Sequence, residues 1–241
     1  MFRRAAADIG FALVLAGPWP ETEDLLLRSG FDRIFFSLEL WKKAPPGFFR
    51  KLRASGVTTP VTIMSRNRSA QVYLSLLRQG VEEVLFKPFC QDVIVRSVLQ
   101  DAREGFEDPT SKVLVVDDFP QMLDLSSEIL GMIGYTQVLE AKSGELAMEV
   151  LKADPSFGLV MSDWNMPGMT GLEFLRELRG SAGIEHLPFM MVTAEADLEF
   201  IKSGIQSGVD AYVVKPFNAS VLEQKLRRLL AARAQKLKAA G

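Results

Sequence analysis

The stretch Val113-Leu-Val-Val-Asp-Asp-Phe-Pro120 decides the fold of this chain, because four aliphatic residues run directly into two adjacent carboxylates. Three later apolar runs also end in a polar group, at Asp163, at Thr193 and at Lys215. Helix-length segments separate these runs, which predicts parallel strands joined by helices. The carboxyl ends of parallel strands lie along one edge of the sheet, where ligands bind. We therefore expect all of these polar groups to converge into one site.

The residue types in this predicted site indicate a metal and a phosphoryl group. Three clustered carboxylates repel one another unless a cation lies among them. All-oxygen ligands favour Mg²⁺ over zinc. Lys215 and Thr193 are suited to bind an anion beside the metal, which points to phosphoryl chemistry.

Length and composition describe a soluble globular protein. The chain has 241 residues, of which 48% are hydrophobic and 24% are charged, enough for one large or two ordinary domains. A net charge of −2 gives no reason to expect binding to DNA or to an anionic membrane. The lone Cys90 excludes an intramolecular disulfide framework. The apolar run at 9–16 is too short to span a membrane. We expect a cytoplasmic protein with no DNA partner and no membrane partner.

The chain contains an internal repeat. Residues 60–89 match residues 188–217 without a gap, and both segments end in Lys-Pro-Phe. Upstream, residues 31–37 parallel residues 157–163. Two similar βα domains explain this pattern. We predict a degenerate domain at 1–105, a linker at 106–111 around the polar, proline-containing stretch, and a second domain at 112–241.

Helix patterns in the second half are orderly. Met122, Leu125, Ile129 and Ile133 recur with a helical period after the acid pair, which predicts a helix there. Further helices are expected at four places between five strands, at about 145–152, 171–179, 197–206 and 219–236.

Residues 112–236 resemble the receiver domain of two-component response regulators, most closely its chemotaxis branch, the CheY regulators. The resemblance rests on Asp117-Asp118 and on the segments 162–168, 191–196 and 212–217. It implies two flavodoxin-like (CheY-like) doubly wound parallel sheets, of which the first is truncated and degenerate. It also implies a phosphorelay in which a histidine kinase is the partner.

The resemblance implies a role for each acid. Asp163 would be the phosphoacceptor that attacks a phosphohistidine of the kinase. Asp118, Asp163 and the backbone carbonyl of Asn165 would bind Mg²⁺ directly, and Asp117 would act through water. The protein would then be a phosphoacceptor that assists its own phosphorylation and dephosphorylation, and not an enzyme in the usual sense.

The remaining implied roles concern binding, switching and turnover of the phosphoryl group. Lys215 and Thr193 would contact the phosphoryl oxygens, and Lys215–Pro216 would be a cis peptide. Thr193 and Tyr212 would act as the switch that changes the face of the fourth helix, fifth strand and fifth helix, where a downstream target binds. Asn165 and Glu195 would tune dephosphorylation.

The first half departs from the family pattern. Lys87 is retained, but Ser37 stands where Asp163 stands, Val84 stands where Tyr212 stands, and the acid pair has no counterpart. Residues 11–16 can be interpreted as the first strand. Alternatively, residues 3–27 can be interpreted as the end of helix one, strand two and helix two. Either way one βα unit is missing. We expect an unphosphorylated pseudo-receiver that serves for homodimerisation or for docking on its neighbour.

The leading functional hypothesis is phosphorylation-dependent protein binding, with a role in chemotaxis or motility. The alternative is a phosphate sink or adaptor that drains or docks a kinase without its own target. A metal-dependent phosphatase of the haloacid-dehalogenase type is disfavoured, because those enzymes carry Asp-x-Asp after the first strand, whereas Asp117 and Asp118 are adjacent.

Overall fold

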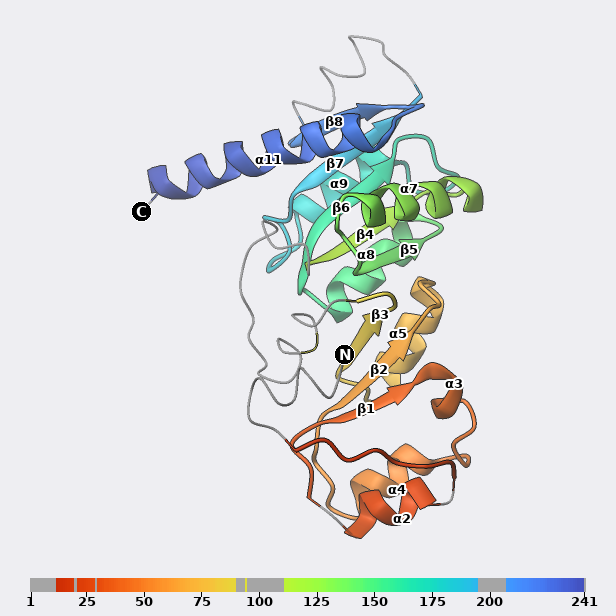
Figure 1. Ribbon diagram of the computed structural model, residues 1–241. Helices are drawn as coiled ribbons and strands as arrows, with labels where there is room; N and C mark the ends of the chain where they lie inside the picture. The colour runs from red at the N-terminus through yellow and green to blue at the C-terminus, as the bar shows by residue number, and fades with distance from the viewer. Residues whose placement is uncertain are drawn as a thin grey trace. The chain divides into compact units, whose positions relative to one another are not determined.

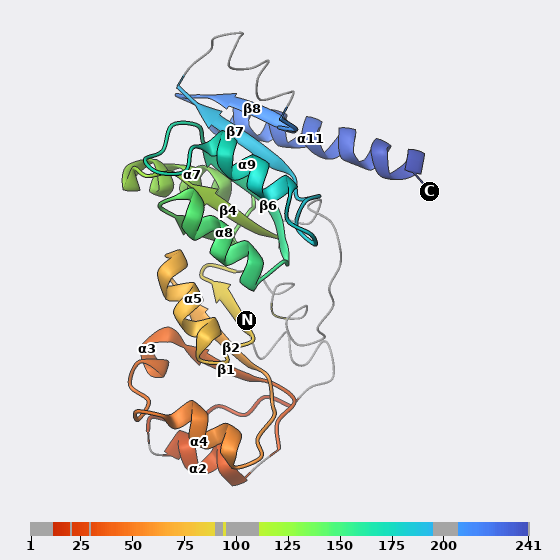
Figure 2. The ribbon, with the colours of Figure 1, turned by 180° about the vertical axis from the view of Figure 1, so that it is seen from behind.

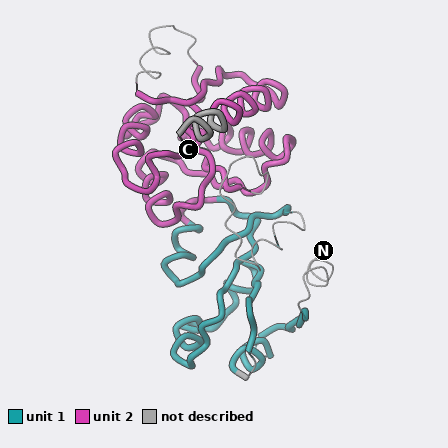
Figure 3. Tube along the Cα trace, turned by 90° about the vertical axis from the view of Figure 1, so that its left-hand side faces the viewer, with its two compact units in different colours: residues 1–68, 72–103 teal, residues 69–71, 104–241 magenta. Residues whose placement is uncertain are grey.

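A computed structural model describes residues 12–19, 21–28, 30–89, 94, 111–194 and 207–240. The chain divides into unit 1 (residues 1–68 and 72–103) and unit 2 (residues 69–71 and 104–241), as Figure 3 shows. Cys90, Glu195, the helix expected at 197–206 and nearly all of the expected linker lie outside the described residues. Among the described residues, no helix combines the length and the apolar composition that crossing a membrane requires.

Unit 2 is built on a five-stranded parallel sheet of order β5-β4-β6-β7-β8. Its strands are β4 (Lys112–Val116), β5 (Val138–Ala141), β6 (Phe157–Asp163), β7 (Phe189–Thr193) and β8 (Ala211–Val214). The first strand therefore lies between the second and the third, which is the flavodoxin-like order. The predicted doubly wound α/β fold is confirmed.

Four described helices cover this sheet. They are α7 (Pro120–Met132), α8 (Gly144–Ala153), α9 (Gly171–Arg179) and α11 (Ala219–Ala240). Figures 1 and 2 show α7 and α11 on one face of the sheet and α8 and α9 on the other. Local sequence fixes the helix starts. Ser143 caps α8 through the N–H of Leu146, and Thr170 and Glu173 form a capping box at α9.

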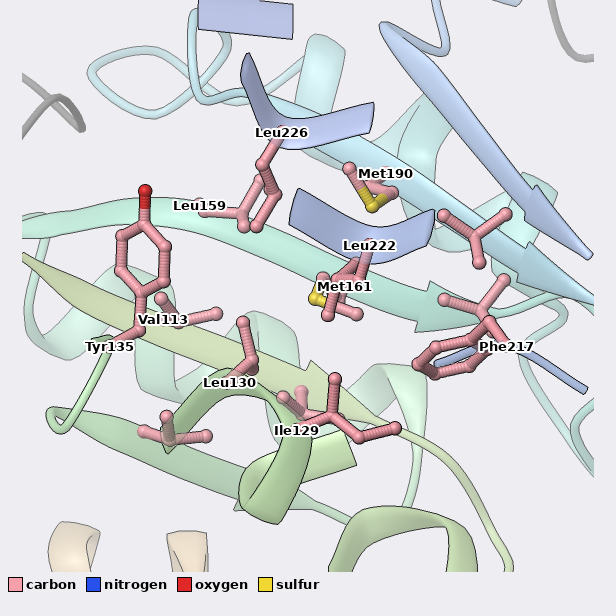
Figure 4. Packing of buried hydrophobic residues seen from close by; sticks show 14 of the residues in the cluster. Val113, Ile129, Leu130, Tyr135, Leu159, Met161, Met190, Phe217, Leu222 and Leu226 are labelled. Atoms are coloured by element: carbon pink, nitrogen blue, oxygen red, sulfur yellow. The ribbon is translucent and has the colours of Figure 1, made fainter. Parts of the chain in front are cut away.

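The core beneath α7 and α11 follows from strand alternation. Val113 and Val115 of β4 point to this face and pack with Leu222 and Leu226 of α11, as the close-up in Figure 4 shows in part. The helix expected after the acid pair is present as α7, but the residues that share its period are not all buried: Leu125 is 42% exposed, while Leu123, Ile129 and Leu130 are buried. A helix rotated by one residue keeps the same period, so periodicity alone did not fix which face is buried.

Unit 1 contains, among its described residues, a three-stranded parallel sheet of order β1-β2-β3. The strands are β1 (Ile34–Ser37), β2 (Val61–Ser65) and β3 (Glu83–Phe86). The helices are α2 (Glu21–Arg28), α3 (Leu38–Trp41), α4 (Phe48–Ala54) and α5 (Ala70–Arg78). Buried aromatic rings pack against one another in this unit. Trp19 meets Phe48 edge-on at 4.5 Å, and Phe36 meets Trp41 at 5.5 Å between ring centroids.

Strand register repeats between the two units. Ser37 pairs with Met64 across β1 and β2. At the equivalent place, Asp163 pairs with Val192 across β6 and β7. Both Lys-Pro peptide bonds of the repeat, Lys87–Pro88 and Lys215–Pro216, are cis, as the sequence led us to expect for the second.

An arginine clamp also occurs in both units. In unit 2, Arg179 donates to the backbone carbonyls of Glu185 and Leu187 and pairs with Asp210, whose carboxylate accepts from the Phe189 N–H. In unit 1 the same contacts are made by Arg53, which donates to two backbone carbonyls and pairs with Glu82; the Glu82 carboxylate accepts from the Val61 N–H. Each clamp fixes the start of a strand next to the helix that precedes it.

The two alternatives for the start of unit 1 are both corrected. Residues 12–17 form no strand, so neither a first strand at 11–16 nor a second strand within 3–27 is found in its described part. Leu13, Val14 and Leu15 are exposed, because the run lacks a neighbouring strand to bury it. The helix expected at the end of 3–27 does form, as α2. Within the described residues, unit 1 thus contains equivalents of only the last three strands of unit 2.

Candidate functional site

Side chains from four strands of unit 2 meet at the carboxyl edge of its sheet. Asp163 is the last residue of β6, Thr193 is the last residue of β7, and Asp117 and Lys215 directly follow β4 and β8. Asp117, Asp163 and Thr193 are all buried. The convergence expected from the sequence is therefore present for these residues.

Lys215 links two of the acids. Its Nζ donates to Asp117 Oδ2 at 2.7 Å and to Asp163 Oδ1 at 2.6 Å. The other oxygens of these carboxylates accept backbone N–H groups, Oδ1 of Asp117 from Phe119 and Oδ2 of Asp163 from Asn165. These contacts hold both carboxylates in fixed orientations.

Burial and the contacts between Lys215 and the carboxylates shift the pKa values of Asp163 and Lys215. Burial raises the pKa of Asp163, and the hydrogen bond and charge of Lys215 only partly offset this effect, since Asp117 adds a second negative charge. Burial alone would lower the pKa of Lys215, but hydrogen bonds and charges from the two carboxylates raise it above its usual value. One ammonium does not fully compensate two buried carboxylates, so the site favours further positive charge.

Asp118 supplies the place for that charge. Its Oδ1 is buried and has no hydrogen-bond partner among the described residues. An unpaired buried carboxylate oxygen is costly unless a cation binds it, and oxygen donors suit Mg²⁺. Within the described ranges, no three His, Cys, Asp or Glu side chains gather into a ready-made metal site. A bound Mg²⁺ would therefore depend on Asp118, Asp163 and a backbone carbonyl, and Asn165, whose N–H is bound to Asp163, lies in the loop that would provide it.

The loop after β6 is held at both ends. Met169 N–H donates to Glu145 Oε1 of α8 at 2.9 Å, and Gly168 next to it has a φ of +77°. At the start of α9, Gly171 N–H donates to the Trp164 carbonyl at 2.9 Å. A Cβ on Gly171 would lie 2.1 Å from the Asp163 carbonyl oxygen, so only glycine fits against the backbone of the candidate acceptor.

The two expected switch residues lie on neighbouring strands. Thr193 is buried, and its carbonyl accepts the Lys215 N–H at 2.7 Å. Tyr212 pairs in register with Met191, one strand over. Its ring is partly exposed, its hydroxyl is buried without a hydrogen-bond partner in the described part of the chain, and burial raises its pKa. An unsatisfied hydroxyl leaves the side chain with little to hold it in one rotamer.

Equivalent positions in unit 1 carry other chemistry. Ser37 Oγ accepts the Leu40 N–H and caps α3. Ser65 Oγ accepts the Asn67 N–H at 2.8 Å and donates to the Asn67 carbonyl. The Ser65 hydroxyl is engaged with the Asn67 backbone, and the Ser37 hydroxyl is engaged with the Leu40 N–H and the Glu39 carboxylate. Neither position carries an acid that could accept a phosphoryl group as Asp163 could.

Comparison with known proteins agrees with the geometry of unit 2. Residues 113–227 match the model of the response regulator receiver domain. The chain is 43% identical over 118 residues to the chemotaxis protein CheY of Pseudomonas aeruginosa. The matched segment covers 49% of this chain and 94% of that protein. The chain belongs to the response regulator family. This response regulator is also 40% identical over 126 residues to chemotaxis protein CheY-3 of Vibrio cholerae, which covers 52% of this chain and 96% of that protein.

Among solved structures, that of chemotaxis protein CheY4 of Vibrio cholerae is 35% identical to this response regulator. It covers 50% of this chain and 99% of its own, with a TM-score of 0.47. The curated relatives thus match about half of the present chain.

Sequence reasoning missed three residues that shape the site. Glu145 could be recognised from Ser143-Gly-Glu as an acid in the first turn of a helix, but its contact with Met169 joins residues far apart in the chain. Gly171 gave a helix start and no sign of its close approach to Asp163. Arg179 could be recognised as a basic residue in the last turn of a helix, but its hydrogen bonds near the start of β7 are visible only in the fold.

Proposed function

We propose that this response regulator accepts a phosphoryl group on Asp163 from a phosphohistidine of a partner kinase, in a Mg²⁺-dependent reaction. The observation that supports this proposal most directly is the Lys215 ammonium between Asp117 and Asp163, beside the buried unpaired oxygen of Asp118. Lysine, hydroxyl and carboxylates at one sheet edge suit transfer to a carboxylate better than hydrolysis of a bound substrate. The protein would accordingly act as a phosphoacceptor and not turn over a substrate of its own.

In the proposed reaction, a carboxylate oxygen of Asp163 attacks phosphorus while the P–N bond to histidine breaks. Asn165 N–H holds Asp163 Oδ2, and Lys215 holds Oδ1, so the carboxylate is oriented before the donor arrives. Mg²⁺, when bound, neutralises charge on the phosphoryl oxygens. Lys215 is then placed to move from Asp163 onto a phosphoryl oxygen while keeping its contact with Asp117.

The proposed output is a change in the face formed by β8 and α11. A phosphoryl oxygen accepts the Thr193 hydroxyl, and the shift of that side chain makes room for Tyr212 to turn inward. The unsatisfied Tyr212 hydroxyl and the exposed Val214 and Val221 beside it support this role. Kinship with CheY proteins makes a chemotaxis or motility target the first candidate.

We propose that unit 1 is a degenerate receiver domain that is not phosphorylated. The repeated strand register, the repeated Lys-Pro-Phe sequence and the repeated arginine clamp support a common ancestry with unit 2. Ser37 in place of an acid, engaged as a helix cap, supports the loss of acceptor function.

The test is intact-mass measurement after incubation with a small-molecule phosphodonor such as acetyl phosphate, with Mg²⁺ and with EDTA. Wild type should gain one phosphoryl group only with Mg²⁺, Asp163→Asn should gain none, and Ser37→Ala should behave as wild type. Asp118→Asn should retain its fold and require more Mg²⁺ for the same rate. Labelling of Asp163→Asn would disprove the acceptor assignment, and loss of labelling in Ser37→Ala would disprove the assignment of unit 1.

A further inference from the structure

Unit 1 keeps the positions of the unit 2 site and changes their charge. Ser65 ends β2 and pairs with Phe86, as Thr193 ends β7 and pairs with Val214. The Lys87 N–H donates to the Ser65 carbonyl at 2.7 Å, the same contact and distance as in unit 2 between Lys215 and Thr193. Ser37, Ser65 and Lys87 are therefore held at one sheet edge, as their counterparts are.

The lysine of unit 1 lacks the partners that hold its counterpart. Lys215 bridges two carboxylates. Lys87 forms no ion pair with any residue in the described part of the chain, nor does Arg66, which directly follows Ser65. Ser37 leaves no acid at the end of β1. Because no carboxylate in the described part of the chain forms an ion pair with Lys87, its ammonium can bind an external anion.

Three charges lie close together at this edge. Hydrogen bonds from its own backbone N–H and from Ser37 lower the pKa of Glu39, and the charges of Lys87 and Arg66 lower it further. An ammonium and a guanidinium thus interact with one carboxylate in unit 1, whereas in unit 2 one ammonium bridges two carboxylates. The sign of the local charge is reversed between the two units.

We propose that the carboxyl edge of the unit 1 sheet is a binding site for a phosphate-type oxyanion, held without a covalent bond by the ammonium of Lys87 and the guanidinium of Arg66. The strand register places Lys87 at the position equivalent to Lys215, the lysine that would contact the phosphoryl group in unit 2. Arg66 adds a planar guanidinium that suits phosphate oxygens. No metal is needed, because the cations belong to the protein. No transfer occurs, because the position of the nucleophile is a capping serine.

The experiment is isothermal titration calorimetry of the full chain with inorganic phosphate, in EDTA and at constant ionic strength. We expect one saturable site. Arg66→Gln and Lys87→Gln should each weaken it about tenfold or more, which corresponds to the loss of one charge-assisted hydrogen bond. Glu39→Gln should tighten binding roughly threefold, since it removes a repelling charge. Damage to the fold would weaken binding in every variant. An affinity that falls in two variants and rises in the third therefore indicates a direct effect on binding.

Arg78→Gln is the matched control, because it removes an exposed cation in the last turn of α5, at the opposite edge of the unit 1 sheet, and should leave the affinity unchanged. Lys215→Gln is measured beside it to detect phosphate that binds at the unit 2 site instead. A parallel titration with glycerol 3-phosphate separates two sources of the same chemistry. Binding of both probes assigns the site to a phosphate monoester group, and binding of phosphate alone assigns it to the free ion. The proposal is overturned if wild type shows no saturable binding, if Arg66→Gln and Lys87→Gln bind as wild type does, or if only Lys215→Gln loses binding.

Discussion

Replacing Gly171 by alanine should damage the site without removing any functional group from it. The new Cβ would lie 2.1 Å from the carbonyl oxygen of Asp163 and 3.0 Å from the sulfur of Met191. Neither the oxygen nor the helix start can yield freely. The oxygen belongs to the backbone of β6, and the Gly171 N–H is bound to the Trp164 carbonyl. The acceptor and α9 must therefore move apart.

The size of this effect can be worked out from the geometry. A contact of 2.1 Å must open by about 0.9 Å to reach the 3.0 Å below which Cβ contacts essentially never occur. Overpacking of this kind costs about 1–3 kcal/mol. For a domain of this size the melting temperature would fall by roughly 5–10 °C. A displacement of about 1 Å at a reacting group can cost on the order of a hundredfold in rate.

The assay is the initial rate of Mg²⁺-dependent labelling by acetyl phosphate, beside a thermal melt of the same samples. Gly131→Ala is the matched control, because a Cβ there meets nothing within 4 Å. It should raise stability by up to about 1 kcal/mol through helix propensity and leave labelling unchanged. If Gly171→Ala melts and labels as Gly131→Ala does, the close approach does not position the acceptor.

Other perturbations test the electrostatics and the supports of the site. Burial raises the pKa of Asp163 in the folded protein, so the folded state binds that proton more tightly and stability falls as pH rises through the folded pKa. Asp163→Asn should therefore be more stable than wild type at neutral pH without divalent cations, and denaturant melts should show this advantage vanish toward acid pH; a constant difference would contradict the linkage. Arg179→Ala removes hydrogen bonds to three backbone carbonyls and one carboxylate, and should cost about 2–3 kcal/mol in the unit 2 transition alone, whereas Arg53→Ala should affect only unit 1. Glu145→Ala frees the Met169 N–H and should raise the Mg²⁺ concentration for half-maximal labelling several-fold with little change in melting temperature; an unchanged Mg²⁺ requirement would show that the loop needs no support from α8.

Much of unit 2 could be predicted because its signals are local. Apolar runs that end in polar residues located β4, β6, β7 and β8, and helices were expected at the places of α8 and α9. Convergence of Asp117, Asp163 and Lys215 followed from the direction of parallel strands alone. The buried face of α7 did not follow, because neighbouring apolar residues allow two phases and packing against β4 and α11 decides between them.

The start of unit 1 was harder to predict, because its described strands correspond to only three of the five strands of unit 2. The apolar run at 12–16 resembles a strand by composition, but a strand needs a neighbour to pair with, and none of the described residues provides one. Contacts such as that between Glu145 and Met169 were equally out of reach, since each residue has an ordinary local explanation. The added positive charge at the end of β2, where Arg66 stands in place of Ala194, could be read from the sequence once Ser65 was aligned with Thr193.

The division of the unit 2 site between strands sets a limit on what substitution can restore in unit 1. The acid pair follows β4, while the acceptor, hydroxyl and lysine come from β6, β7 and β8. The described strands of unit 1 correspond only to the second group. Ser37→Asp would thus return a carboxylate next to Lys87 and still leave it without an acid pair for a metal. An engineer who wished to revive this half of the protein would have to add a strand with its helix to the three strands described, since no point mutation within those strands can supply the position of the acid pair.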